Sequence, residues 1–149
     1  MTTINIFIPV TSYKKIKDKQ FIKMENCLPV VLSNLKTKYI SKVHDAELIR
    51  YRLTDDNYRD VINLGLMISF DIPQTVAPED LKKNINVRTA LHYLTNAINK
   101  YWKDNLKIDG HTLWWFIDVC IFGANLDHVE QQFEARDVEI IRPDERELL

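Results

Sequence analysis

Histidine is the residue type in this sequence with the widest scope for acid–base chemistry. His44 and His111 stand in the segments HDAE and DGH, beside acidic residues and near the starts of predicted strands. An imidazole changes its charge near neutral pH, and catalysis requires such a base together with a group that orients it. If the two segments converge in space, His44 and His111 form an acid–base pair for a phosphate substrate. A phosphoesterase-like or nuclease-like enzyme is therefore one alternative function.

The spacing of the histidines argues against a recognised site. Four histidines occur, and none follows the HxxxH, HxH or HExxH pattern, so we expect no metal site. Two-histidine phosphoesterases carry a pair of His-x-Thr strands. Here Ala46 and Leu113 stand two places after His44 and His111, and both lack the hydroxyl group. We therefore expect surface histidines near turns, and a chain that is not an enzyme.

Cysteine, serine and glycine offer no better-supported site. Cys27 and Cys120 both lie among apolar residues, where burial raises the pKa of a thiol and keeps it unreactive. Two cysteines do not form a disulfide framework, which favours reduced thiols in a cytoplasmic protein. No serine stands in a GxSxG elbow, and three glycines cannot build a phosphate-binding loop. We accordingly expect no cofactor.

Composition indicates one globular domain over residues 1–149, with a charged tail at 142–149. The net charge is −1, which argues against the basic face of a nucleic-acid-binding protein. Lysines gather at 14–23 and acidic residues beyond 125, which we interpret as two solvated segments. No apolar run approaches the length of a membrane span, and the N-terminus lacks the order of a signal peptide. A cytoplasmic location is expected.

Hydrophobic periodicity predicts alternating strands and helices. Period-two alternation of apolar residues predicts strands over 4–10, 48–53, 62–72, 111–122 and 138–141. Helical spacing predicts helices over 24–41, 77–105 and 125–135. Pro9 donates no backbone hydrogen bond, so we expect it to mark the end or an unpaired edge of the first strand. Pro29 suits the first turn of the first helix.

The order of these elements defines the expected fold class, which is α+β. The first six elements match a ferredoxin-like βαββαβ arrangement, an antiparallel sheet with helices on one face. The last helix and strand form an extra C-terminal αβ unit. Turn residues join the strands over 48–53 and 62–72, which predicts an antiparallel hairpin.

The segment HTLWWFIDVCIFGA, residues 111–124, is apolar on both of its faces. Alternation places Trp115 on one face, and Trp114 with Phe116 on the other. A strand of this kind is covered on both sides, whereas a sheet with helices on one face leaves the other open to water. Either the C-terminal helix or the lysine-rich loop covers that face, or a partner does. We predict one tryptophan in the core and the other on a surface that is covered.

The interpretation that remains is a non-enzymatic binding protein that acts on another protein, of an inhibitor or immunity type from bacteria or phage. Large aromatic side chains contribute most to protein interfaces, and acidic residues can imitate nucleic acid in a basic site. The expected partner-binding residues are Trp114, Phe116, Met67, Asp127, Glu130 and Glu134. A homodimer through the open sheet face is a further alternative.

An RNA-binding module is the last alternative. The segments IFIPVT and LGLMISF loosely resemble the two sheet motifs of RNA-recognition domains, which share the expected topology. Leu66 and Ile68 occupy positions where such domains stack aromatic side chains on bases, and only Phe7 and Phe70 lie nearby. The lysines of 14–23 would have to contact the phosphates. We therefore do not expect nucleic acid as the partner.

Overall fold

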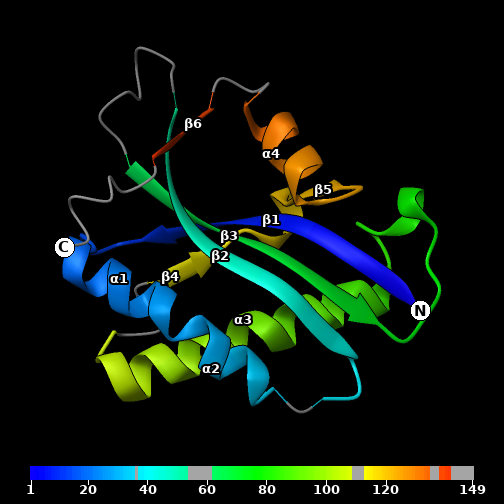
Figure 1. Cartoon of the computed structure of the whole chain (residues 1–149), viewed down its shortest axis with the longest axis horizontal. Helices are drawn as coiled ribbons and strands as arrows, with labels where there is room; N and C mark the ends of the chain where they lie inside the picture. Colours follow the sequence, from blue (N-terminus) through cyan, green and yellow to red (C-terminus); the bar gives the residue numbers. More distant parts are fainter. Residues whose placement is uncertain (36, 54–61, 109–112, 135–137, 142–149) are drawn as a thin grey trace.

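The described part of the chain in the computed structural model comprises residues 1–35, 37–53, 62–108, 113–134 and 138–141 (Figure 1). The side chains at 53, 62, 133, 134 and 138 lie outside that description. The elements in chain order are β1 (Thr2–Ser12), α1 (Asp18–Asn26), α2 (Leu28–Ser33), β2 (Lys42–Leu53), β3 (Ile62–Ile72), the 3-10 turn η1 (Pro78–Asp80), α3 (Ile85–Leu106), β4 (Leu113–Trp115), the 3-10 turn η3 (Ile117–Val119), β5 (Ile121–Gly123), α4 (Leu126–Glu134) and β6 (Val138–Ile141).

The strands form one antiparallel six-stranded sheet. Its order is β4-β1-β3-β2-β6, and β5 also pairs with β1. β1 and β3 therefore lie inside the sheet, and β2 pairs with β3 as the predicted hairpin. The isoleucines that alternate along β1 suit this interior position, because β-branched side chains pack well on a pleated surface. The prediction of an α+β fold with an antiparallel sheet is confirmed.

Helices cover both faces of the sheet, to different extents. Helices α1, α2 and α3 pack on one face, and α4 packs on the other (Figure 1). Ile6 and Ile8 of β1 point into the main core beneath the first three helices, where Trp102 of α3 is the largest fully buried side chain. Phe7 and Met67 point the other way, into a second cluster beneath α4. The C-terminal helix therefore covers part of the face that a two-layer arrangement would leave open.

The predicted strand over 111–122 is interrupted. It divides into β4, η3 and β5, and both strands pair with β1. The break lies opposite Pro9. The backbone N–H of Phe116 donates to the Pro9 carbonyl over 2.9 Å, but Pro9 has no N–H to return the bond. β1 itself continues to Ser12, and Pro9 pairs with Gly65 of β3, so the expectation that Pro9 marks the end or an unpaired edge of the strand is wrong.

The helices also begin at residues other than those predicted. The predicted helix over 24–41 corresponds to the end of α1 and to α2, which ends at Ser33, and Pro29 lies in the first turn of α2 as expected. The predicted helix over 77–105 starts with η1, and α3 begins only after Asn84. The Asn84 side chain accepts hydrogen bonds from the N–H groups of Asn86 and Val87, at 2.9 and 3.2 Å, and so caps α3. No helix in the described residues is long and apolar enough to cross a membrane.

Candidate functional site

The two neighbouring tryptophans of β4 point to opposite faces of the sheet. Trp115 packs against the main core: its ring stacks on Trp102 with 6.1 Å between centroids, and its Nε1–H donates to Asn99 Oδ1 over 2.9 Å. Trp114 is exposed. Successive side chains of a strand alternate between faces, so the inward position of Trp115 directs Trp114 outward. The predicted opposite orientation is confirmed, with Trp115 half-buried against the core and Trp114 on the surface, while the expected cover over Trp114 stays a prediction.

Exposed apolar side chains gather on β4 and the turn that follows it. Trp114, Phe116 and Val119 are 56%, 38% and 57% exposed, and we name these three residues the apolar strip. β4 is the last strand on its side of the sheet, so within the described chain no strand lies along its outer edge. A group of large apolar side chains left on a folded surface is typical of an interaction site.

The η3 end of the apolar strip carries charged side chains of both signs. Arg88 Nη2 lies 2.7 Å from Asp118 Oδ1, and that carboxylate is largely exposed. Burial raises the pKa of the Cys120 thiol, next to Val119, to about 11, although Lys82 and Arg88 oppose this rise because they favour the thiolate. The raised pKa keeps Cys120 protonated and unreactive at neutral pH.

The other predicted partner-binding residues divide between core and surface. Met67 is only 3% exposed, because it packs in the second cluster beneath α4, and it therefore offers no surface to a partner. Asp127 is exposed and Glu130 is half-buried on α4, whereas the side chain of Glu134 lies outside the described residues. The aromatic and acidic residues thus lie on different elements, the former on β4 and before η3, the latter on α4.

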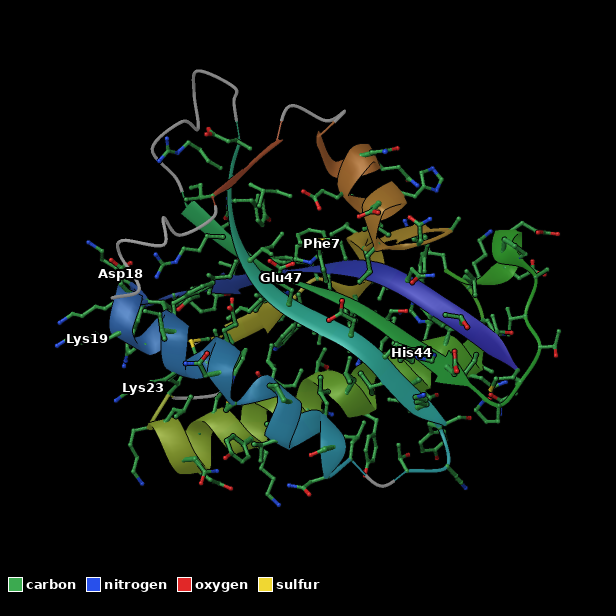
Figure 2. The ribbon with its side chains drawn as sticks, in the orientation of Figure 1. Phe7, Asp18, Lys19, Lys23, His44 and Glu47 are labelled. Atoms are coloured by element: carbon green, nitrogen blue, oxygen red, sulfur yellow. The ribbon has the colours of Figure 1, made fainter. Side chains whose placement is uncertain are left out.

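The aromatic residues considered for base stacking are buried. Phe70 lies in the main core, and Phe7, labelled in Figure 2, lies in the second cluster. The Phe7 ring packs edge-on to Tyr51 with 5.6 Å between centroids. Leu66 and Ile68 are also buried in the main core. None of these positions presents an aromatic face to a base, so the structure gives no support to an RNA-recognition mode on this sheet.

The partner of His44 in the described structure is Asp71. His44 Nε2 lies 2.8 Å from Asp71 Oδ2, and Thr3 Oγ1 donates to Asp71 Oδ1 over 2.6 Å. The pairing of β1 with β3 sets Thr3 opposite Asp71, and an irregularity in the pairing of β2 with β3 falls at His44. Such bulges commonly redirect a side chain. His111, the expected second histidine, lies outside the described residues.

His44 also lines a cleft of about 460 Å³ between α2 and the N-terminal half of β2. The polar side chains around it are Ser33, Ser41, Lys42 and Asp45. Asp71 orients the imidazole through Nε2, as the partner of a general base would. The described residues contain no cluster of metal-ligating side chains. The hydroxyl of Ser33 donates to the Val30 carbonyl over 3.0 Å, so this hydroxyl does not donate to His44.

Asp71 is expected to stabilise the fold only while it is ionised. The hydrogen bond from Thr3 lowers the pKa of Asp71, and His44 and Lys42 lower it further, while burial acts in the opposite direction. A carboxyl group whose pKa is lower in the folded protein than in the unfolded chain stabilises the fold at pH values above its pKa in the unfolded chain, which is near 4. This contribution is lost as the pH falls through the lower pKa of the folded protein. Asp71→Asn should therefore lower the free energy of unfolding at neutral pH, and its difference from wild type should shrink below about pH 4.

Urea unfolding of both proteins between neutral pH and about pH 3 measures this difference. Asp127→Asn is the matched control, because it removes an exposed carboxylate from α4. The control should differ little from wild type at every pH. A destabilisation by Asp71→Asn that stays constant over the whole range would contradict an ionised role for this carboxyl group.

Comparison of the chain with protein-family models, with curated proteins and with solved structures found no significant match.

Proposed function

We propose that this chain is a non-enzymatic binding protein that captures another protein through the apolar strip. The observation that carries the proposal is the exposure of Trp114 beside the inward-facing Trp115. A tryptophan ring is among the largest apolar side chains, and leaving it in water forgoes the stabilisation that burial would give. Tryptophan is also enriched among the few residues that dominate protein interfaces. Phe116 and Val119 extend the same surface along the chain.

The chemistry around the strip indicates the kind of partner. Arg88 and Asp118 form an ion pair at its η3 end, so the complementary surface combines an apolar pocket for Trp114 with polar groups at its rim. An inhibitor or immunity-type role agrees with this mode of action, since such proteins work by occupying a surface of their target. The free cysteines, Cys27 and Cys120, agree with a reducing compartment such as the cytoplasm.

We also propose that the fold is related to the ferredoxin-like class. The strand order β4-β1-β3-β2, with α1, α2 and α3 on one face, supports this relationship. β6 then extends the sheet beyond β2 and, with α4, forms the extra C-terminal αβ unit.

Trp114→Ala should weaken partner capture by about 30-fold or more, which corresponds to about 2 kcal/mol for a residue at the centre of an interface. The immobilised full chain is incubated with lysate of its native host, and captured proteins are identified by mass spectrometry. The affinity of the purified partner is then measured for each variant. Val30→Ala is the matched control, because Val30 is an exposed apolar residue on α2, outside the strip.

A partner that binds wild type and Val30→Ala but not Trp114→Ala supports the proposal. Equal capture by all three proteins contradicts it. A molecular mass of two chains by sedimentation, restored to one chain by Trp114→Ala, would assign the strip to a homodimer instead.

The contact between His44 and Asp71 favours an acid–base enzyme as the second candidate function. It supplies an oriented imidazole at the edge of a cleft, which is the usual setting of a general base. Replacement of both His44 and His111 by alanine tests this candidate in cells. If the double variant keeps full biological activity, the enzymatic function is excluded.

A further inference from the structure

A separate pocket, of about 280 Å³, lies where β1 leads into α1. Figure 2 shows Asp18, which lines this pocket, near the left end of the view, and His44 to the right of the centre. Its charged lining residues are Lys14, Lys15, Arg50 and Asp18. Thr11 and Asn63 add a hydroxyl and an amide group. The pocket shares no residue with the apolar strip or with the His44 cleft, and one carboxylate in it opposes three cations.

Arg50 is held in this pocket by contacts on two sides. Its guanidinium carbon lies 4.3 Å from the centre of the Phe21 ring, and Nη1 lies 2.5 Å from Asp18 Oδ1. Nη2 is buried, and it has no hydrogen-bond partner among the described residues. A buried donor without an acceptor destabilises the fold, and more so when the group is charged. An acceptor that reached Nη2 would remove this penalty.

Asp18 is a weak partner for the guanidinium group. The Asp18 side chain is 83% exposed, whereas that of Arg50 is 20% exposed. An ion pair with one partner in water contributes little, because the solvent screens it and the free side chain loses entropy. The Asp18 carboxylate can therefore leave Nη1 with little loss of stability when a more strongly charged anion binds there.

We infer that this pocket binds a phosphate group, either free phosphate or the end of a small phosphomonoester. A guanidinium fork binds two phosphate oxygens side by side, and lysine ammonium groups neutralise the remaining charge. The phosphate takes the place of Asp18 on Nη1, and Lys14 and Lys15 line the same pocket. The volume lies just below the range of about 300–1,000 Å³ that is typical of ligand pockets, so the ligand is small.

An NMR titration of the full chain with sodium phosphate, and separately with glycerol phosphate, tests the site. Sodium chloride at the same ionic strength is the reference. Saturable shifts are expected for the backbone amides of 11–18, Asn63 and Leu64 with both phosphates, and no saturation with chloride. Equal affinities assign recognition to the phosphate group itself, and a higher affinity for glycerol phosphate assigns it to the ester. Absence of saturation with both ligands overturns the inference.

Lysine variants distinguish a specific phosphate site from nonspecific electrostatic attraction of phosphate to the protein. Lys14→Gln together with Lys15→Gln should weaken phosphate binding at least about tenfold. Lys82→Gln together with Lys83→Gln removes the same charge elsewhere and should leave the affinity unchanged. Equal weakening by the two lysine pairs overturns the inference.

The Asp18 carboxylate competes with phosphate for Arg50, so its removal should have the opposite effect to removal of the lysines. Asp18→Asn should strengthen phosphate binding, because it frees Nη1 from its present partner. Asp127→Asn removes an equal charge from α4 and should have no effect. An Asp18→Asn variant that binds phosphate no better than the Asp127→Asn control would show that the anion does not compete for Arg50, and so overturns the inference.

Discussion

Trp102→Ala is expected to lower the free energy of unfolding by about 3–5 kcal/mol. Trp102 is fully buried on α3 and stacks on Trp115 of β4. Its Nε1–H lies 3.3 Å from the Met24 carbonyl and 3.1 Å from Cys27 Sγ, at the end of α1. Truncation leaves a cavity where α1, α3 and β4 meet, and it leaves the buried Met24 carbonyl without this donor. The loss should therefore loosen the strand that carries the apolar strip.

Trp114→Ala is the natural control for this prediction, because it makes the same chemical change on an exposed face of β4. We expect it to change the free energy of unfolding by no more than about 0.5 kcal/mol. Urea unfolding followed by far-ultraviolet circular dichroism measures both variants without relying on tryptophan fluorescence. Similar losses for the two variants would contradict the assignment of one tryptophan to the core and the other to a binding surface.

Gly65→Ala is expected to lower the free energy of unfolding by at least about 2 kcal/mol, as overpacking does in a filled core. A Cβ atom at this position would lie 2.1 and 2.3 Å from Cε2 and Cζ of Phe7, well inside van der Waals contact. The ring has little room to move, because it is buried in the second cluster and packs edge-on to Tyr51. The glycine is therefore required by the close approach of an aromatic ring across the strand pair.

A double-mutant cycle tests this explanation. The substitution Phe7→Leu removes the ring atoms that the new methyl group would meet, so Gly65→Ala should cost much less in that background. Thermal or urea unfolding of the four proteins gives the coupling energy between the two positions. If Gly65→Ala costs the same with Phe7 and with Leu at position 7, the effect lies in the backbone of β3 and not in the contact with the ring.

The sequence by itself determined the parts of this protein that follow from local pattern. Period-two alternation predicted β1 and the hairpin of β2 and β3, because side chains of a strand alternate between faces wherever the strand lies. The ring of Pro29 predicted the first turn of α2, since this position needs no backbone donor. The same alternation predicted that Trp114 and Trp115 face opposite ways.

Only the tertiary structure decided features that depend on residues distant in sequence. The break between β4 and β5 arises from Pro9, which is more than a hundred positions away and lacks the donor that continuous pairing requires. Met67 was predicted to be a surface residue, but the packing of α4 buries it. Asp71 was not predicted as a site residue, and its one local signal is a carboxylate within the apolar alternation of 62–72.

The candidate sites likewise depend on contacts between residues that are distant in sequence. Pairing of β1, β2 and β3 brings Thr3, Asp71 and His44 together, and no spacing along the chain encodes that contact. Arg50 likewise acquires its buried, unpaired nitrogen only when α1 packs against β2. Local patterns set which face a side chain takes, because they act through the backbone of one strand or helix. Which faces remain open, and which polar groups meet, depends on how the separate elements pack together.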